Sequence, residues 1–133
     1  VIVIDNHVLV AKAVNATTTF LPGGHVEVGE SMPATLEREL LEELGLVVKV
    51  ERYLGVIEHG YGSLAEYEIN HVFSARCELK ELTPLHSRES HLTFKWLTLD
   101  SLAENNLLPT PAIALVHHYA AAKPEAFWAS TLA

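Results

Sequence analysis

The chain opens with two short runs of apolar, β-branched residues, which predict strands over residues 1–4 and 8–13. The polar segment 5–7 between them favours a tight turn, so the two strands are expected to pair as a hairpin. Residues 15–19 are polar and predict a loop. A short strand is expected over 25–28, after a proline and two glycines that indicate a tight turn.

The next pattern has a helical period. A methionine and three leucines, each four residues after the last, form one apolar stripe along a helix that can pack on a sheet. These residues are Met32, Leu36, Leu40 and Leu44. Ser31 is suited to cap the first turn, and Pro33 is tolerated within that turn. Gly45 is suited to end the helix, which is therefore expected over 32–44.

Strand and helix patterns alternate along the rest of the chain. The expected elements are strands at 47–58 and 66–79, joined through Gly60-Tyr61-Gly62-Ser63, a strand at 93–99, and helical stretches at 100–105 and 111–122. This order predicts an α/β fold in which a mixed central sheet is covered by helices on both faces.

Composition limits the size and the compartment. The chain has 133 residues, of which 49% are hydrophobic, and this suits a single domain over 1–133. Apolar runs stay far below the roughly 20 residues that cross a bilayer, and the first residues do not resemble a signal peptide. The one cysteine, Cys77, has no partner for an internal disulfide. A cytoplasmic location is therefore expected.

The charge excludes some partners. The net charge is −8, from 17 acidic and 9 basic residues, and this argues against a basic surface for duplex nucleic acid or an anionic membrane. We therefore expect no long nucleic acid and no membrane as partner. A phosphorylated small molecule remains compatible when divalent cations lie between the carboxylates and the phosphates. Assembly into a homodimer stays open.

Three glutamates of the expected helix lie beside its apolar stripe. With Glu39 at 0°, Glu42 lies at about 300° and Glu43 at about 40°, so they share an arc of roughly 100°. Like charges at these spacings destabilise a helix by about 0.2–0.5 kcal/mol per pair. One interpretation is a solvated acidic face, which is common on helices. The other is a site for Mg²⁺, which takes oxygen ligands.

The residues around these glutamates favour the second interpretation. Nine positions stand in the pattern G-x5-E-x7-R-E-U-x-E-E-x-G-U, where U is a bulky aliphatic residue. They are Gly24, Glu30, Arg38, Glu39, Leu40, Glu42, Glu43, Gly45 and Leu46. The pattern resembles the complete Nudix box of the Nudix hydrolases. The resemblance implies an α/β/α sandwich in which the box forms a loop, a helix and a second loop.

The resemblance also implies a site for the catalytic cation, Mg²⁺ or alternatively Mn²⁺. The implied ligands in the box region are Glu39, Glu42, Glu43 and the carbonyl of Gly23. Glycine at position 23 also suits a turn that only glycine makes at low cost. Gly24 would support the site, and Glu30 and Arg38 look like the pair that braces the loop against the helix. An ordinary surface ion pair is the alternative for these two residues.

Many Nudix proteins draw a further carboxylate from a loop ahead of a strand that contains tryptophan. Glu89, within 87–97, is the candidate, as cation ligand or as general base. Some relatives place this acid about three residues before the tryptophan, where the present chain has Thr93, so Glu66 and Glu68 stay open as substitutes. The candidates for the base that accepts a proton from water are Glu42, Glu43 and Glu89.

The resemblance implies attack of water on one phosphorus of a diphosphate. The expected substrate is a small nucleotide-like molecule, either a nucleoside triphosphate or a nucleoside diphosphate derivative. Tyr61 is a candidate for contact with it, because a core role is less natural on a glycine-flanked loop. The alternative function is a non-catalytic nucleotide-binding regulatory module on the same fold, although such relatives commonly lose glutamates of the box.

Overall fold

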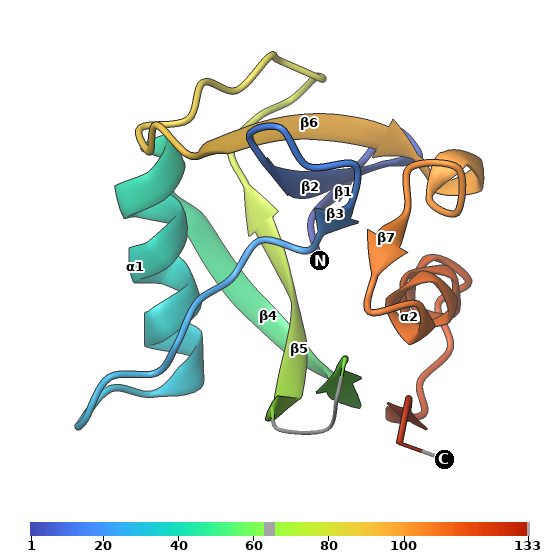
Figure 1. The fold of residues 1–133 in the computed structure, drawn as a ribbon. Coiled ribbons are helices and arrows are strands. Elements are labelled where there is room, and N and C mark those ends of the chain that lie inside the picture. Colours follow the sequence, from blue (N-terminus) through green and yellow to red (C-terminus); the bar gives the residue numbers. More distant parts are fainter. Residues whose placement is uncertain (63–65, 133) are drawn as a thin grey trace.

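The structure is a computed structural model that describes residues 1–62 and 66–132. Its elements in chain order are β1 (Val3–Ile4), β2 (His7–Ala13), β3 (Thr19–Phe20), α1 (Met32–Leu44), β4 (Val48–Tyr61), β5 (Glu66–Cys77), β6 (Leu92–Thr98), the 3-10 helix η1 (Leu99–Ser101), β7 (Leu107–Leu108), α2 (Pro111–Ala120) and β8 (Phe127–Ser130). Ser63, part of the expected connection between the two long strands, lies outside the described residues. Helices α1 and α2 lie on opposite sides of the strands (Figure 1).

The expected hairpin is confirmed at β1 and β2. Asp5 and Asn6 between them have left-handed φ angles of 47° and 62°, as a two-residue turn between twisted strands requires. Ile4 therefore pairs directly with His7.

Strand β2 is the centre of the first sheet, which also holds β1, β3, β6 and β7. Val8 and Val10 belong to one core cluster, while Leu9 and Ala11, on the other face of the strand, belong to a second. All four side chains are 0% exposed. A strand buried on both faces lies between two covering layers, so the expected α/β architecture is confirmed.

A second sheet holds β4, β5 and β8. Strand β4 pairs with β5 in antiparallel and with β8 in parallel orientation, and β3 pairs in parallel with β7 in the first sheet. The strands therefore form two mixed sheets. The sequence analysis did not anticipate β3, β7 and β8, because each is short and pairs with a strand that is distant in sequence.

Helix α1 has the predicted bounds and caps. The Ser31 hydroxyl accepts from the Ala34 N–H at 3.3 Å, and Gly45 ends the helix with a left-handed φ of 65°. Leu40 and Leu44 are buried as expected, and a buried Thr35 joins them. The expected role of Met32 in the apolar stripe is wrong, because this first-turn side chain is 39% exposed and extends past the edge of the core.

Three other expectations need correction. No strand forms over 25–28: Val26 and Val28 are exposed, and no neighbouring strand pairs with this segment within the described residues. The helix expected over 100–105 is only the turn η1, and turns follow it to Asn106, whose φ is positive. Helix α2 ends at Ala120 rather than 122, since Ala122 also has a positive φ. Among the described helices, none has the length and apolar character needed to cross a membrane.

Candidate active site

The N-terminal half of α1 is joined to the preceding loop by two charged side chains. Arg38 donates from Nε to Glu30 Oε1 at 2.7 Å and from Nη2 to Glu30 Oε2 at 3.0 Å, a two-pronged pairing. Thr35 also donates to Glu30 Oε2, at 2.7 Å. The hydrogen bonds from Arg38, followed by that from Thr35, lower the pKa of Glu30 to about 2. The structure thus brings together the predicted pair, and adds Thr35, which the sequence analysis missed.

Arg38 also reaches two of the expected cation ligands. Its Nη1 donates to Glu39 Oε1 at 2.8 Å and to Glu42 Oε2 at 3.3 Å. The Glu39 side chain is 18% exposed, whereas that of Glu42 is 58% exposed. Because one guanidinium serves both carboxylates, Arg38 holds them on the same side of the helix.

Gly24 lies directly against Glu39. A Cβ at position 24 would overlap the Glu39 carboxyl group, so the demand for glycine comes from space. Gly23 is different, because its φ lies outside the left-handed region and a Cβ there would meet only the Leu36 side chain, at 3.7 Å. The expectation that position 23 needs a turn reserved for glycine is therefore wrong.

The carboxylates gather at the C-terminal half of α1. Burial, together with the charges of three other glutamates, raises the pKa of Glu43 to about 7. In order of effect these are Glu39, Glu89 and Glu42. The four acids that the sequence singled out are thus close enough for the charges of three to act on the fourth.

Glu89 comes from a loop far along the chain, and Arg88 attaches this loop to the helix. The Arg88 N–H donates to the Glu43 carbonyl at 2.6 Å, which satisfies one of the free carbonyls at the helix end. The Arg88 guanidinium lies over Gly45, where a Cβ would overlap it. The sequence analysis missed Arg88, although its place beside Glu89 made it a reasonable candidate.

The chemistry of these side chains fits a divalent cation. Carboxylate oxygens are the ligands that Mg²⁺ prefers, and a cation would relieve the mutual repulsion felt by Glu43. In the part of the chain that the structure describes, no three acidic, histidine or cysteine side chains already converge as a ready cation site. Glu39 and Glu42 are instead turned to Arg38, which supplies the nearest positive charge.

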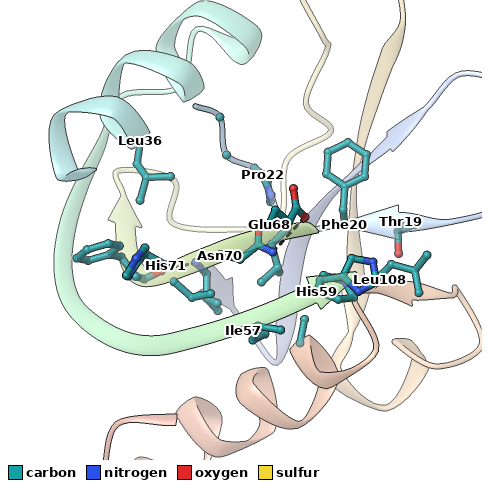
Figure 2. Close-up of a pocket in the computed structure, with 18 of the residues that line it drawn as sticks. Thr19, Phe20, Pro22, Leu36, Ile57, His59, Glu68, Asn70, His71 and Leu108 are labelled. Atoms are coloured by element: carbon teal, nitrogen blue, oxygen red, sulfur yellow. Dashed lines mark hydrogen bonds between the residues drawn. The ribbon is translucent and has the colours of Figure 1, made fainter. Parts of the chain in front are cut away.

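A cavity of about 540 Å³ adjoins the box at Gly23 and Gly24. One wall comes from β3 and its continuation, including Phe20, and the opposite wall comes from β4 and β5 (Figure 2). Tyr61 and Glu68 both line it. The expectation that Tyr61 lies on a loop is wrong, because β4 continues through Gly60 and ends at Tyr61, which pairs with Glu66 of β5. Glu66, the other proposed substitute for Glu89, is not among the lining residues.

The sequence analysis missed most polar groups of the cavity. They are Thr18, Thr19, His25, His59, Asn70 and His71. For the residues on β4 and β5, the signal that would have placed them at the cavity is the register of the two strands, in which His59 pairs with Glu68 and Ile57 with Asn70. Strand alternation then places Glu68 and Asn70 on one face.

Comparison with known proteins identifies the family. A family model described as NUDIX domain matches residues 1–118. The chain is 32% identical to the 8-oxo-dGTP diphosphatase of Buchnera aphidicola subsp. Schizaphis graminum, over 72% of this chain and 67% of that protein. It is 44% identical to the ADP-ribose pyrophosphatase of Methanocaldococcus jannaschii, over 39% of this chain and 32% of that protein. The chain therefore belongs to the Nudix family and is a Nudix hydrolase.

The fold agrees with this assignment. A NUDIX hydrolase from Nitrosomonas europaea superposes with a TM-score of 0.75, over 92% of this chain and 86% of that one, at 22% identity. At that identity the likeness concerns the fold alone.

Proposed function

We propose that the protein hydrolyses the diphosphate linkage of a nucleoside triphosphate or a nucleoside diphosphate derivative with the help of Mg²⁺, for which Mn²⁺ can substitute. The proposed cation ligands are Glu39, Glu42, Glu43, Glu89 and the carbonyl of Gly23. Bound there, the cation would supply the positive charge that neutralises the phosphoryl oxygens during attack by water.

One observation carries the proposal: the charges of three other glutamates act on Glu43, at the end of a helix whose preceding loop lines a cavity of about 540 Å³. The pKa of Glu43, raised to about 7 by burial and by its acidic neighbours, indicates that no positive charge compensates Glu43 itself. The cavity meets this group at Gly24, which contacts Glu39. A substrate with its nucleoside in the cavity would therefore extend its phosphates toward the carboxylates.

The chain's own residues supply the base. Glu42 is held by Arg38, whereas no arginine or lysine side chain among the described residues forms an ion pair with Glu43 or Glu89, and Glu89 has only His91 nearby, at 3.9 Å. We therefore assign the proton acceptor to the pair Glu43 and Glu89. A carboxylate at hydrogen-bond distance from the attacking water would take its proton as the bond to phosphorus forms.

The names of the relatives support the substrate class. The Buchnera protein is called an 8-oxo-dGTP diphosphatase and the Methanocaldococcus protein an ADP-ribose pyrophosphatase. Both names refer to cleavage of a diphosphate within a nucleotide. In the present chain Tyr61 lines the cavity and would contact the nucleoside.

The test is a screen of nucleoside triphosphates and nucleoside diphosphate derivatives with Mg²⁺ or Mn²⁺, in which both products are identified. Glu42→Gln should lower kcat by about 100-fold or more, as expected for a group that acts on the reacting phosphate. Its side chain is exposed, so the fold should persist. Glu37→Gln is the matched control, since Glu37 belongs to the same helix but accepts from the Val50 N–H at 3.1 Å.

Near wild-type turnover of Glu42→Gln at saturating Mg²⁺ would show that the ligand assignment is wrong. Binding of a nucleotide without cation-dependent release of a phosphate product would instead favour a regulatory binding module.

A further inference from the structure

The cavity contains an acidic side chain that the proposed hydrolysis does not use. Glu68, on β5, lines the cavity, and Figure 2 shows it projecting toward the Pro22 and Phe20 side. Its Oε1 accepts hydrogen bonds from the Tyr61 hydroxyl and from Asn70 Nδ2, the latter at 3.0 Å. Two donors on one oxygen fix the orientation of the carboxyl group.

The donors themselves are held in place. Burial, followed by the hydrogen bond to Glu68, raises the pKa of Tyr61 to about 12. The phenol is therefore un-ionised at neutral pH and acts as a hydrogen-bond donor to Glu68. The His59 ring lies edge-on to the Tyr61 ring, with centroids 4.6 Å apart. His59 is fixed in turn by a hydrogen bond of 3.1 Å between its Nδ1 and Thr131 Oγ1.

This arrangement leaves acceptors facing the cavity. An ionised carboxylate has about four lone-pair positions and donates no hydrogen. The other oxygen of Glu68, Oε2, receives no hydrogen bond from residues 1–62 or 66–132, and Asn70 has used an N–H of its amide group. A ligand that satisfies this wall must bring N–H or O–H donors, because an acceptor placed against the carboxylate would be repelled.

We propose that Glu68 determines base specificity by selecting a nucleobase that presents two adjacent N–H groups on one edge, as guanine does with N1–H and its 2-amino group. The inference rests on the proposed function for placing the base in this cavity. Hypoxanthine has the N1–H alone. Adenine places the unprotonated N1 beside its amino group, so a lone pair would oppose the carboxylate.

Glu68 is the only acidic side chain among the described residues that line the cavity. Phe20 lines the opposite wall and is 36% exposed, so its ring is available for stacking. Stacking on an aromatic ring tolerates any base because every base has a π face. The other lining residues carry no negative charge: some, such as Ile57 and Leu108, are apolar, and others, such as Asn70, are neutral polar groups. The choice among bases therefore falls to Glu68.

The first test compares kcat/KM for dGTP, dITP and dATP with Mg²⁺. Each N–H donor that the base lacks leaves the Glu68 carboxylate without a hydrogen bond. We therefore expect kcat/KM to fall by about tenfold from dGTP to dITP and further for dATP. Glu68→Gln, which keeps an acceptor for Tyr61 and Asn70, should lower kcat/KM for dGTP by about tenfold and leave that for dATP within about twofold.

Two variants serve as controls. Glu66→Gln removes a charge from the same strand outside the cavity lining and should leave the ratio of dGTP to dATP unchanged. Phe20→Leu should lower kcat/KM for all three nucleotides by similar factors, since it removes only the stacking interaction with the base. If Glu68→Gln lowers kcat equally for all three bases, Glu68 acts in hydrolysis and the inference is wrong.

A second measurement is independent of turnover. Guanosine, inosine and adenosine are titrated into the cation-free protein in the presence of a chelator, and binding is followed by NMR shifts of cavity residues. We expect guanosine to bind most tightly and Glu68→Gln to remove its advantage. Equal affinities in the wild-type protein would overturn the inference. Selective binding of guanosine without hydrolysis of any nucleotide would instead contradict the proposed function and leave the inference standing.

Discussion

The loop that leads into α1 and the C-terminal end of α1 carry the same kind of side chain in opposite electrostatic states. At the N-terminal end Glu30 receives hydrogen bonds from Arg38 and Thr35, and its pKa lies at about 2. At the C-terminal end burial and acidic neighbours raise the pKa of Glu43 to about 7. Both carboxylates belong to the same short motif, so the motif combines a neutralised part with an uncompensated one.

This difference separates structure from chemistry. At the N-terminal end the negative charge of Glu30 is neutralised by a residue of the chain itself, because Arg38 supplies the positive charge. The C-terminal end is not neutralised in this way, since Glu43 has acidic neighbours and no ion-pair partner among the described residues, and Glu89 has only His91, at 3.9 Å. We infer that the first end fixes the loop and that the second is adapted to a ligand of positive charge.

The largest effect is expected from Glu43→Gln, which removes the centre of the uncompensated end. Turnover should fall by about 100-fold or more, because a proposed ligand and base is lost. A steady-state assay at saturating Mg²⁺ measures this. Turnover within a few-fold of wild type would show that the end of α1 is an acidic surface without a catalytic role.

The same variant also tests the pKa of Glu43. An acid whose pKa rises on folding binds its proton more tightly in the folded state. The cation-free wild type should therefore lose stability as pH rises from 4.5 to about 7, the interval between the ordinary and the raised pKa of Glu43. Glu43→Gln should lack this loss in urea unfolding followed across the same interval. Parallel curves for the two proteins would contradict the assigned pKa.

A smaller effect is expected from Arg88→Ala, which removes the guanidinium that lies over Gly45 and so loosens the loop that carries Glu89, while the backbone N–H of residue 88 still donates to the Glu43 carbonyl. We expect kcat to fall by about tenfold, the order seen when a group that orients a ligand is lost. The nucleotide KM should change little, because Arg88 does not line the cavity. Arg76→Ala, which removes an exposed arginine paired with Glu51 on the second sheet, is the control. Unchanged kcat in Arg88→Ala would mean that Glu89 does not depend on this contact.

The smallest effect is expected from Glu30→Gln at the neutralised end. A lowered pKa contributes stability that is present above the ordinary value of 4.5 and is lost as pH falls toward about 2. The variant lacks this contribution, so its melting temperature should lie below that of the wild type at pH 7 and approach it in acid. Thermal unfolding between pH 7 and pH 2 measures the difference. A constant gap across that range would contradict the role given to Arg38.

The parts of the molecule that sequence predicts well are local. Ser31, Gly45 and the leucine period define α1 because caps and periodicity depend on neighbouring residues. The spacing of the box likewise placed Glu39 and Glu43 on neighbouring turns of one helix, where their charges interact, and their role as cation ligands stays a prediction.

The parts that sequence predicted poorly depend on distant contacts. The contact of Arg88 with the Glu43 carbonyl joins two segments that no local pattern relates. Glu68 and Asn70 become cavity residues only through the register of β5 with β4. The strand expected over 25–28 failed for the same reason, since a strand requires a partner and none pairs with these residues in the described part of the chain.

The cavity draws its walls from both sheets, with Phe20 and Leu108 on the first and Ile57 and Asn70 on the second. An occupant therefore touches two layers of strands at once, and its binding energy opposes their separation. Any molecule that binds only the folded protein raises the free energy of unfolding as its concentration exceeds its Kd. Resistance to heat thus becomes a report on occupancy, available for compounds that the enzyme never converts.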